Sequence, residues 1–333
     1  MILIACDSFK EFGSSTKVGS FIQEGIRSNL SLHTDVINIS DGGEGFLNSI
    51  IDHLKGEIFT INVRDPLLRP TKAHVGICGN IGIIEMAEAS GVQKFEIGER
   101  HFMNSSSYGT GELIAFTINK GCNRIILGLG GAATGDGGIG AAQALGMQFK
   151  LKDTYISNNK PIISTKDLSN IKDVKFDFIP QRYKNIELIV ASDVNNIAIG
   201  KNGATRTFGP QKGASEIEIE LIEKAMVNYL KLLEKKISQK LNIKGIGAAG
   251  ALALSLFPIF NVKIKNGLSV VLDLIDFGQK IMKSDWVITG EGCLDKLSLL
   301  GKPPLQIAKI CKQKNKKVIG VFGMIKDDME EGI

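Results

Sequence analysis

R-I-I-L-G-L-G-G-A-A-T-G-D-G-G-I-G, running from Arg124 to Gly140, is the stretch that decides how the fold is interpreted. Its apolar beginning, Ile125 to Leu127, is typical of a buried strand, and apolar residues from Ile139 onward predict a helix. The glycines between them let the backbone approach a ligand closely. Since the amides of such a turn and the positive start of the following helix both favour an anion, we expect this loop to bind a phosphate group.

Two alternatives remain open for this loop on its own residues. Gly128 to Ala133 follows the pattern G-x-G-x-x-A, which after a strand is also typical of dinucleotide-binding enzymes. The same glycine spacing recurs from Gly245 to Gly250 without a clear preceding strand, so the pattern has low specificity. The other alternative is a tight turn without a ligand. A Walker loop is absent, because no glycine is followed by Lys-Ser or Lys-Thr at the required distance.

Composition narrows the class of protein. The length of 333 residues favours two domains, and 43% hydrophobic with 23% charged residues is usual for a soluble globular protein. A net charge of +5 with both signs interspersed does not indicate a nucleic-acid partner. Five cysteines without a C-x-x-C pair indicate reduced thiols. With neither a secretory signal nor an apolar span in the sequence, we expect a cytoplasmic protein with no membrane partner.

The order of strand and helix patterns predicts two domains. Both ends of the chain alternate strands with helices, as a parallel sheet requires. Between them, Gly79-Asn80 joins two apolar runs as the turn of an antiparallel hairpin. We therefore predict an α/β fold in which residues 1–57 plus 268–333 form a Rossmann-like parallel sheet. Residues 58–267 form an inserted α/β domain with antiparallel hairpins and the glycine-rich phosphate loop.

Three local expectations matter later. The uncharged stretch Gly245–Val262 predicts a buried helix near residues 247 to 257. Trp286 to Thr289 is predicted to be a strand that ends in a loop from Gly290 to Asp295. Ser106 and Ser107 precede a helical pattern, and hydroxyl groups in that position usually cap the helix.

Acidic residues recur in or beside glycine-rich turns that follow predicted strands. This set consists of Asp7, Asp41, Glu44, Asp136, Asp193, Glu291 and Asp295. One such carboxylate is usually a turn residue, but seven of them with Lys10 and Lys212 indicate a magnesium and phosphate site. Mg²⁺ prefers a few carboxylates plus phosphate oxygens, and phosphoryl transfer requires chiefly positioning and charge neutralisation. The pattern therefore favours a kinase.

Ordered motifs resemble those of the bacterial glycerate kinases of type I. The matching segments are D-S-F-K (7–10), S-D-G-G-E-G (40–45), I-E-M-A-E-A-S-G (84–91), S-S-Y-G-T-G-E (106–112), G-L-G-G-A-A-T-G-D-G-G (128–138), F-G-P-Q-K-G-A (208–214), G-A-A-G-A (247–251) and V-I-T-G-E-G-C-L-D (287–295). They span nearly the whole chain, and together they are far more specific than any one of them.

The resemblance implies an activity and an architecture. The expected reaction transfers the γ-phosphate of ATP, with Mg²⁺, to a hydroxyl of D-glycerate, giving chiefly 2-phosphoglycerate. The expected site lies in the cleft between two α/β domains, one of them Rossmann-like. The small-molecule partner is glycerate, and a homodimer stays open because the sequence does not determine the oligomeric state.

The resemblance also suggests residue roles, as hypotheses. For ATP the residues are Gly130, Gly131, Thr134, Gly137, Gly138 and Lys212, and for glycerate they are Asp7, Ser8, Ser106 and Ser107. Magnesium candidates are Asp41, Glu44, Glu291 and Asp295. Catalysis is assigned to Lys10 and Asp193, with Asp193 orienting or deprotonating the attacking hydroxyl as a positioned Asp does in other kinases.

Departures from the family pattern keep two other functions open. Asn195 replaces an aspartate and Cys293 an arginine, and the chain stops at Ile333 where family members continue for several dozen residues. A catalytically impaired relative that binds small acids is one alternative. A dinucleotide-dependent oxidoreductase that uses the loop at Gly128 is the other.

Overall fold

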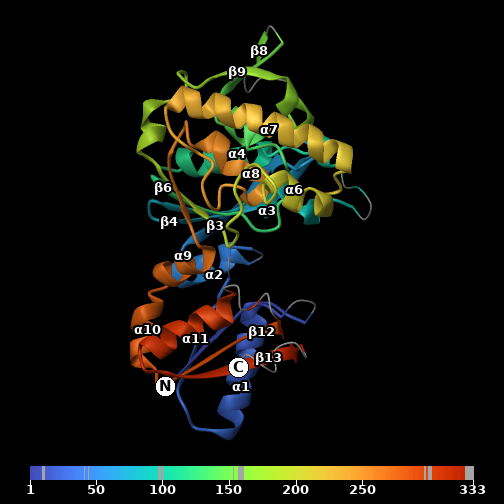
Figure 1. Ribbon diagram of the computed structural model, residues 1–333. Helices are drawn as coiled ribbons and strands as arrows, with labels where there is room; N and C mark the ends of the chain where they lie inside the picture. The colour runs from blue at the N-terminus through green and yellow to red at the C-terminus, as the bar shows by residue number, and fades with distance from the viewer. Residues whose placement is uncertain are drawn as a thin grey trace. The chain divides into compact units, whose positions relative to one another are not determined.

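The computed structural model describes residues 1–9, 12–40, 42–43, 45–96, 99, 101–152, 154–156, 161–295, 298 and 302–326. The chain divides into two compact units (Figure 1). The terminal unit combines Met1–Lys55 with Gly267–Ile333, and the central unit is Gly56–Asn266. Both units contain helices and sheets, which confirms the predicted α/β class.

The terminal unit contains a four-stranded parallel sheet in the order β13-β12-β1-β2. Its strands are β1 (Ile2–Cys6), β2 (Thr34–Val36), β12 (Trp286–Leu294) and β13 (Lys317–Ile325). Its helices are α1 (Ser15–Asn29), α2 (Phe46–Leu54), α9 (Gly267–Leu274), α10 (Phe277–Lys283) and α11 (Pro303–Gln313). Ile2 pairs with Trp286, so the two ends of the chain share one sheet, as the parallel rhythm predicted.

One face of this sheet is covered by α1. Ile2, Ile4 and Cys6 alternate along β1 and are buried together with Val18 of α1. Alternation with period two is what a strand needs to present one apolar face to a helix. The pattern therefore buries every second residue of β1 under α1.

The C-terminal part of β12 differs from the prediction, which placed a loop after Thr289. Pairing with β13 continues past Thr289, with Glu291 opposite Phe322 and Cys293 opposite Met324. The segment from Gly290 to Leu294 is thus strand, and the predicted loop there is wrong. The long partner strand provides the extra backbone hydrogen bonds that keep this segment extended.

The central unit is built on a mixed six-stranded sheet in the order β11-β10-β6-β5-β4-β3. Its strands are β3 (Glu57–Arg64), β4 (Pro70–Cys78), β5 (Ile81–Glu85), β6 (Arg124–Gly128), β10 (Glu187–Ala191) and β11 (Asn261–Lys265). The hairpin turned at Gly79-Asn80 pairs β4 with β5 antiparallel, as predicted. Strands β5, β6, β10 and β11 run parallel to one another.

The parallel strands end in register at one edge of the sheet. Glu85 is aligned with Gly128, Gly128 with Ala191, and Ala191 with Lys265. The segments that follow these strands therefore all begin at the same edge. This edge is where open α/β sheets bind ligands.

Helices and a second sheet complete the central unit. The helices are α3 (Ala87–Ser90), α4 (Tyr108–Asn119), α5 (Ile139–Ala144), α6 (Ala204–Phe208), α7 (Glu216–Ile237) and α8 (Ala248–Ala251). Short 3-10 helices are η1 (Val92–Lys94), η2 (Phe102–Asn104), η3 (Thr165–Asn170), η4 (Gln181–Asn185), η5 (Pro210–Lys212) and η6 (Leu252–Leu256). The small antiparallel sheet consists of β7 (Gln148–Leu151), β8 (Thr154–Ile156) and β9 (Ile171–Lys175). In Figure 1 the long helix α7 crosses the central unit near β9.

The predicted helix near residues 247 to 257 is wrong in form. Ala249, Gly250 and Ala251 have left-handed backbone angles, and a 3-10 helix follows them. The carbonyl of Gly250 accepts a hydrogen bond from the amide of Gly137 at 3.0 Å. A Cβ at position 250 would collide with the carbonyl of Thr134, so the close approach of the glycine-rich loop sets this conformation.

Candidate active site

The glycine-rich loop has an exposed beginning and a buried end. Gly130 is half-buried and Gly131 exposed, whereas residues 133–140 are all buried. Gly131 has a φ of 68°, a left-handed conformation in which glycine is unstrained. Its carbonyl accepts the amide of Val92 at 2.9 Å, and the amide of Ala133 donates to Ser90 at 2.9 Å. The turn at 130–132 is thus fixed to the segment after β5 and remains accessible to a ligand.

Asp136 lies at the buried end of the loop and binds the starts of two helices. One carboxylate oxygen, Oδ2, accepts the amide and the hydroxyl of Ser107 at 2.9 and 2.8 Å, and the amide of Gly140 at 3.2 Å. The other oxygen, Oδ1, accepts the amide of Gly138 at 3.0 Å. Burial raises the pKa of Asp136, and the bonds from Ser107 and the glycine amides act in the opposite direction. The carboxylate of the protein itself therefore occupies the start of α5.

This arrangement changes the roles expected of Gly137 and Gly138. The amide of Gly137 donates to Gly250, and that of Gly138 donates to Asp136. A Cβ at Gly138 would collide with the carbonyl of Leu252. Gly137 has a left-handed backbone with a φ of 63°, and Gly138 is needed for close packing, so the start of α5 does not offer these amides to a phosphate. The expectation that this helix start faces an anionic ligand is corrected accordingly.

Ser106 and Ser107 are also fully buried. The hydroxyl of Ser106 donates to the carbonyl of Ile163 at 2.7 Å, and that of Ser107 donates to Asp136. Ser107 is the N-cap residue of α4, but its side chain makes no capping hydrogen bond, because Asp136 takes its hydroxyl. A direct contact of these hydroxyls with glycerate would require the internal bonds to be exchanged.

Lys212 lies inside the protein beside the same loop. It ends η5, is 4% exposed, and its Nζ donates to the carbonyl of Thr134 at 2.7 Å. Burial lowers the pKa of Lys212 to about 8, and the charge of Asp136 opposes that shift. Within the described part of the chain, the buried hydroxyl of Thr134 has no hydrogen-bond partner. Lys212 and Thr134 thus form a buried contact that supports the loop from inside the protein.

Asp193 follows β10 at the edge where the loop begins. Gly128 is aligned with Ala191, and the amide of Leu129 donates to the carbonyl of Ala191 at 3.1 Å. Asp193 and Gly130 each come two residues after that aligned pair, on neighbouring parallel strands. The Asp193 side chain is exposed, and its Oδ1 accepts Nδ2 of Asn266 at 3.2 Å. The central unit therefore presents a carboxylate and a glycine turn at one sheet edge.

The terminal unit carries two other predicted substrate residues. Asp7 and Ser8 follow β1 directly and are half-buried. The carboxylate of Asp7 accepts the amide of Ser8 at 2.7 Å, and the amide of Asp7 donates to Gly290 at 2.9 Å. The preceding thiol, Cys6, is held neutral, because burial followed by the charge of Asp7 raises its pKa to about 12.

Two magnesium candidates of the same unit, Glu291 and Asp295, lie beside lysines. Glu291 accepts Nζ of Lys302 at 3.0 Å and the hydroxyl of Ser298 at 2.7 Å. Asp295 lies 3.7 Å from Lys302 and 3.6 Å from Lys326. These two carboxylates are thus compensated by ammonium groups in this structure.

Three predicted residues, Lys10, Asp41 and Glu44, lie outside the described residues. Over the ranges that are described, no group of three or more His, Cys, Asp or Glu side chains is arranged to hold a metal ion.

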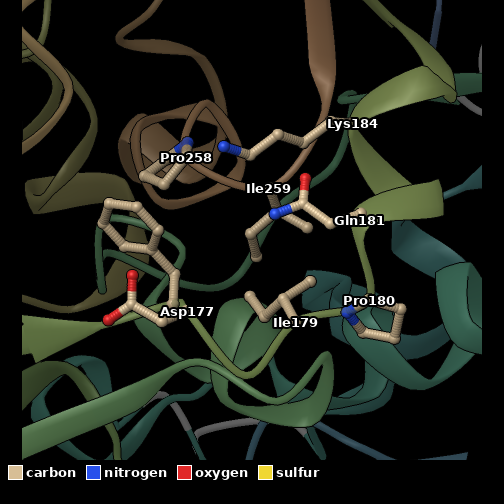
Figure 2. A pocket seen from close by; sticks show the side chains of 8 residues that line it. Asp177, Ile179, Pro180, Gln181, Lys184, Pro258 and Ile259 are labelled. Carbon is tan, nitrogen blue, oxygen red and sulfur yellow. The ribbon is translucent and has the colours of Figure 1, made fainter.

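A pocket elsewhere in the central unit does not coincide with the predicted site. Figure 2 shows it between the segment from Phe176 to Lys184 and the pair Pro258 and Ile259. Its volume is about 50 Å³, far below the several hundred Å³ of a typical ligand pocket. None of the predicted site residues lines it.

A comparison with known protein families identifies the family of this chain. The model of the glycerate kinase family matches residues 2–332. The chain belongs to the glycerate kinase family.

Curated relatives agree with that assignment. A glycerate kinase from Halalkalibacterium halodurans is 36% identical over 328 residues, which cover 97% of this chain and 85% of the relative. A glycerate 2-kinase from Escherichia coli K12 is 36% identical over 332 residues, covering 98% and 86%. A crystal structure of a protein assigned as glycerate kinase 2 from Salmonella typhimurium LT2 is 32% identical, with a TM-score of 0.87 over 98% of this chain and 89% of that one. The family resemblance read from the motifs is confirmed, and the dinucleotide-dependent alternative finds no support.

Membership of the glycerate kinase family implies ATP as a co-substrate and a small-molecule acceptor. No helix among the described residues has the length and apolar character needed to cross a membrane.

Three residues have structural roles that the sequence motifs do not predict. Asp136 was one carboxylate among seven, although an Asp just before a helix is a common cap signal. Asn266 and Lys302 belong to none of the motifs. Their partners, Asp193 and Glu291, are 73 and 11 residues away in sequence. Single-sequence patterns contain no signal for contacts of that kind.

Proposed function

We propose that this protein is a glycerate kinase that transfers the γ-phosphate of ATP to a hydroxyl of D-glycerate, giving 2-phosphoglycerate. Family membership supports the reaction class, and the choice of hydroxyl follows the name of the Escherichia coli relative. The observation that carries the proposal is the alignment of Gly128 with Ala191 on neighbouring parallel strands. Because of this register, the exposed glycine turn and the segment with Asp193 begin side by side at the same edge of the sheet.

The exposed part of the loop is the proposed binding element for ATP phosphates. Gly130 and Gly131 have no side chain to keep phosphate oxygens away from the backbone. Backbone amides in such a turn bind anions without any charged side chain. Thr134, Gly137, Gly138 and Lys212 enter the proposal as support for this turn from the interior.

Asp193 is the proposed catalytic base. In the reaction, the glycerate hydroxyl oxygen forms a bond to the γ-phosphorus as the bond to the β-phosphate oxygen breaks, and ADP leaves. The hydroxyl proton passes to the Asp193 carboxylate, as it does to the catalytic-loop aspartate of protein kinases. Asn266 donates to Oδ1 of Asp193 and so helps to orient this carboxylate.

The remaining assignments are proposals from the family motifs. Asp7 and Ser8 of the terminal unit are proposed to bind glycerate, and Ser106 and Ser107 of the central unit are substrate-binding candidates from their own motif. Lys10 is proposed to assist catalysis. Asp41, Glu44, Glu291 and Asp295 remain magnesium candidates, although the lysines beside Glu291 and Asp295 favour charge compensation there.

Mg²⁺ is proposed to arrive with ATP. Its usual ligands are one or two carboxylates plus substrate phosphates, so ATP itself would supply part of its coordination. When bound, it supplies charge neutralisation at the transferring phosphate.

A cytoplasmic location is part of the proposal. All five cysteines are free thiols, as expected of a protein in a reducing compartment.

The test is ADP release coupled to a spectrophotometric readout, with purified protein, ATP, Mg²⁺ and a panel of hydroxy acids. ADP release that requires D-glycerate supports the proposal, and phosphorus NMR of the product then distinguishes 2-phosphoglycerate from 3-phosphoglycerate. Silence at millimolar substrate, with glycerate binding retained in calorimetry, would instead identify a non-catalytic acid-binding relative. Titration with NADH serves as the control for the oxidoreductase alternative.

A further inference from the structure

The buried end of the glycine-rich loop contains two groups of opposite charge that face no solvent. Asp136 is fully buried, and Lys212 is 4% exposed. They are close enough for the charge of Asp136 to affect the titration of Lys212, but they are not in direct ion-pair contact. Burying a charge is costly unless it is compensated. A pair of this kind therefore needs a reason beyond stability.

Each member of the pair fixes a different part of the loop. Lys212 donates to the carbonyl of Thr134 at 2.7 Å. Asp136 binds the amides of Gly138 and Gly140 and connects them to Ser107 at the start of α4. The segment from 134 to 140 is thus held from η5 on one side and from α4 on the other.

The exposed turn lies between this segment and a second anchor. On its other side, Gly131 and Ala133 are bonded to Val92 and Ser90. Gly130 and Gly131, which have no side chain, are half-buried and exposed, and residues 133–140 are buried. The position of the exposed turn is therefore determined by interior contacts.

We propose that Lys212 and Asp136 are positioning residues that hold the glycine-rich loop so that Gly130 and Gly131 face the ATP phosphates, while neither of the two charged groups touches the nucleotide. The proposal rests on the kinase function above. Lys212 also adds a positive charge beneath the phosphates that low-dielectric surroundings screen weakly.

The groups around Lys212 make its charge testable by pH. Asp136 faces it from the loop, and the Tyr229 hydroxyl of α7, bonded to Ser255 at 2.7 Å, lies near that carboxylate as a neutral group. Burial raises the pKa of Tyr229, so this phenol stays protonated. Loss of the Lys212 proton near pH 8 leaves Asp136 uncompensated. We therefore expect the KM for ATP to rise as the pH increases through 8.

The first experiment needs no catalysis and uses the ligand-free full-length protein. Hydrogen exchange of peptides covering residues 129–140 is compared in wild type, Lys212→Met, Lys212→Arg and the exposed control Lys224→Met. Loss of a charge-assisted hydrogen bond predicts exchange faster by about tenfold or more in Lys212→Met. Lys224→Met is expected to match wild type. Unchanged exchange in a folded Lys212→Met protein would overturn the positioning role.

The second experiment separates positioning from direct contact. In Lys212→Met we expect the KM for ATP to increase at least tenfold and to lose its rise above pH 8, with the KM for glycerate unchanged. Lys212→Arg keeps the positive charge, so the rise of its KM for ATP should occur at a pH well above that of wild type. If Lys212→Met does not fold, the Arg variant alone decides. A Lys212→Arg profile identical to wild type would refute the proposal.

The two experiments also separate this inference from the function. Faster exchange without any kinase activity in wild type would contradict the proposed function and leave the loop support in place. Normal kinase activity in wild type with unchanged exchange in Lys212→Met would support the proposed function and contradict the positioning role of Lys212.

Discussion

The carboxylate of Asp136 accepts two hydrogen bonds from Ser107, one from its amide at 2.9 Å and one from its hydroxyl at 2.8 Å. Since the same oxygen also accepts the amide of Gly140, one side chain connects the starts of α4 and α5. The two helices approach so closely that a Cβ at Gly140 would collide with the hydroxyl of Ser106. The sequence presents this region as a phosphate loop, but its buried half is an internal anion site filled by the protein.

The stability of the central unit is expected to depend on Asp136. Asn at this position has one acceptor oxygen, so Asp136→Asn leaves at least one of the four donors without a partner. We expect the free energy of unfolding of the central unit to fall by about 2–4 kcal/mol, the cost of an unsatisfied buried donor plus a lost charge-assisted bond. Urea denaturation followed by circular dichroism measures it.

The matched control is Asp177→Asn, because Asp177 is an exposed aspartate of the same unit. It is expected to change stability by less than about 0.5 kcal/mol. Equal effects of the two substitutions would contradict the central role given to Asp136.

The titration of Lys212 predicts a pH dependence of stability. Burial lowers its pKa from the usual 10.5 to about 8. Between these two values the unfolded chain binds the proton and the folded protein does not, so the free energy of unfolding rises with pH across this window. The full contribution is about 3 kcal/mol. ATP affinity, in contrast, is expected to fall over the same window.

Lys212→Met should lack this contribution. Subtracting its stability curve from that of wild type between pH 7.5 and about 10.5 isolates Lys212 from other titrating groups. A difference that stays flat, or slopes downward, would show that Lys212 titrates outside this window.

Asp193 and Asn266 predict a pair of kinetic effects. Removal of the proposed base in Asp193→Asn is expected to lower kcat by about 10²- to 10⁴-fold. Asn266→Ala removes one hydrogen bond to the carboxylate and is expected to lower kcat by about 3- to 10-fold, with the KM for ATP unchanged. Full turnover by Asp193→Asn would refute the assignment of the base.

Lys302 is expected to stabilise the terminal unit through Glu291. The Glu291 side chain is 8% exposed and would lose its ammonium partner in Lys302→Met. Breaking a buried pair costs about 3–5 kcal/mol, and we expect about 1–2 kcal/mol here because solvent reaches the partly exposed Lys302. Thermal unfolding compares this variant with Lys309→Met, an exposed lysine of α11, the helix that Lys302 precedes, and no change is expected for the control.

Gly131 offers a test of the exposed turn. A residue other than glycine at a φ of 68° is strained by about 1–2 kcal/mol. A Cβ at this position would lie 3.4 Å from the Cβ of Ala87, an ordinary contact, so backbone strain is the expected effect of Gly131→Ala. We expect an increased KM for ATP with little change in kcat. An unaltered KM would show that the phosphates bind elsewhere.

Local patterns predicted those elements whose formation depends on neighbouring residues. The buried strand at Ile125 to Leu127 and the hairpin at Gly79-Asn80 are both present. The expectation failed at Ala249 to Ala251, where contact with the glycine-rich loop determines the backbone, and at Gly290, where pairing with β13 extends the strand. In both places a distant segment supplied the decisive hydrogen bonds.

The sequence by itself determined the α/β class and the family, because periodicity and ordered motifs are properties of the chain read in one direction. The tertiary structure alone decided which glycines of the loop are exposed and which amides are already bonded. Ser107 lies 29 residues before Asp136, and Lys212 lies 78 residues after Thr134. Whether an amide can bind a ligand depends on partners brought near it by folding, and a motif does not record them.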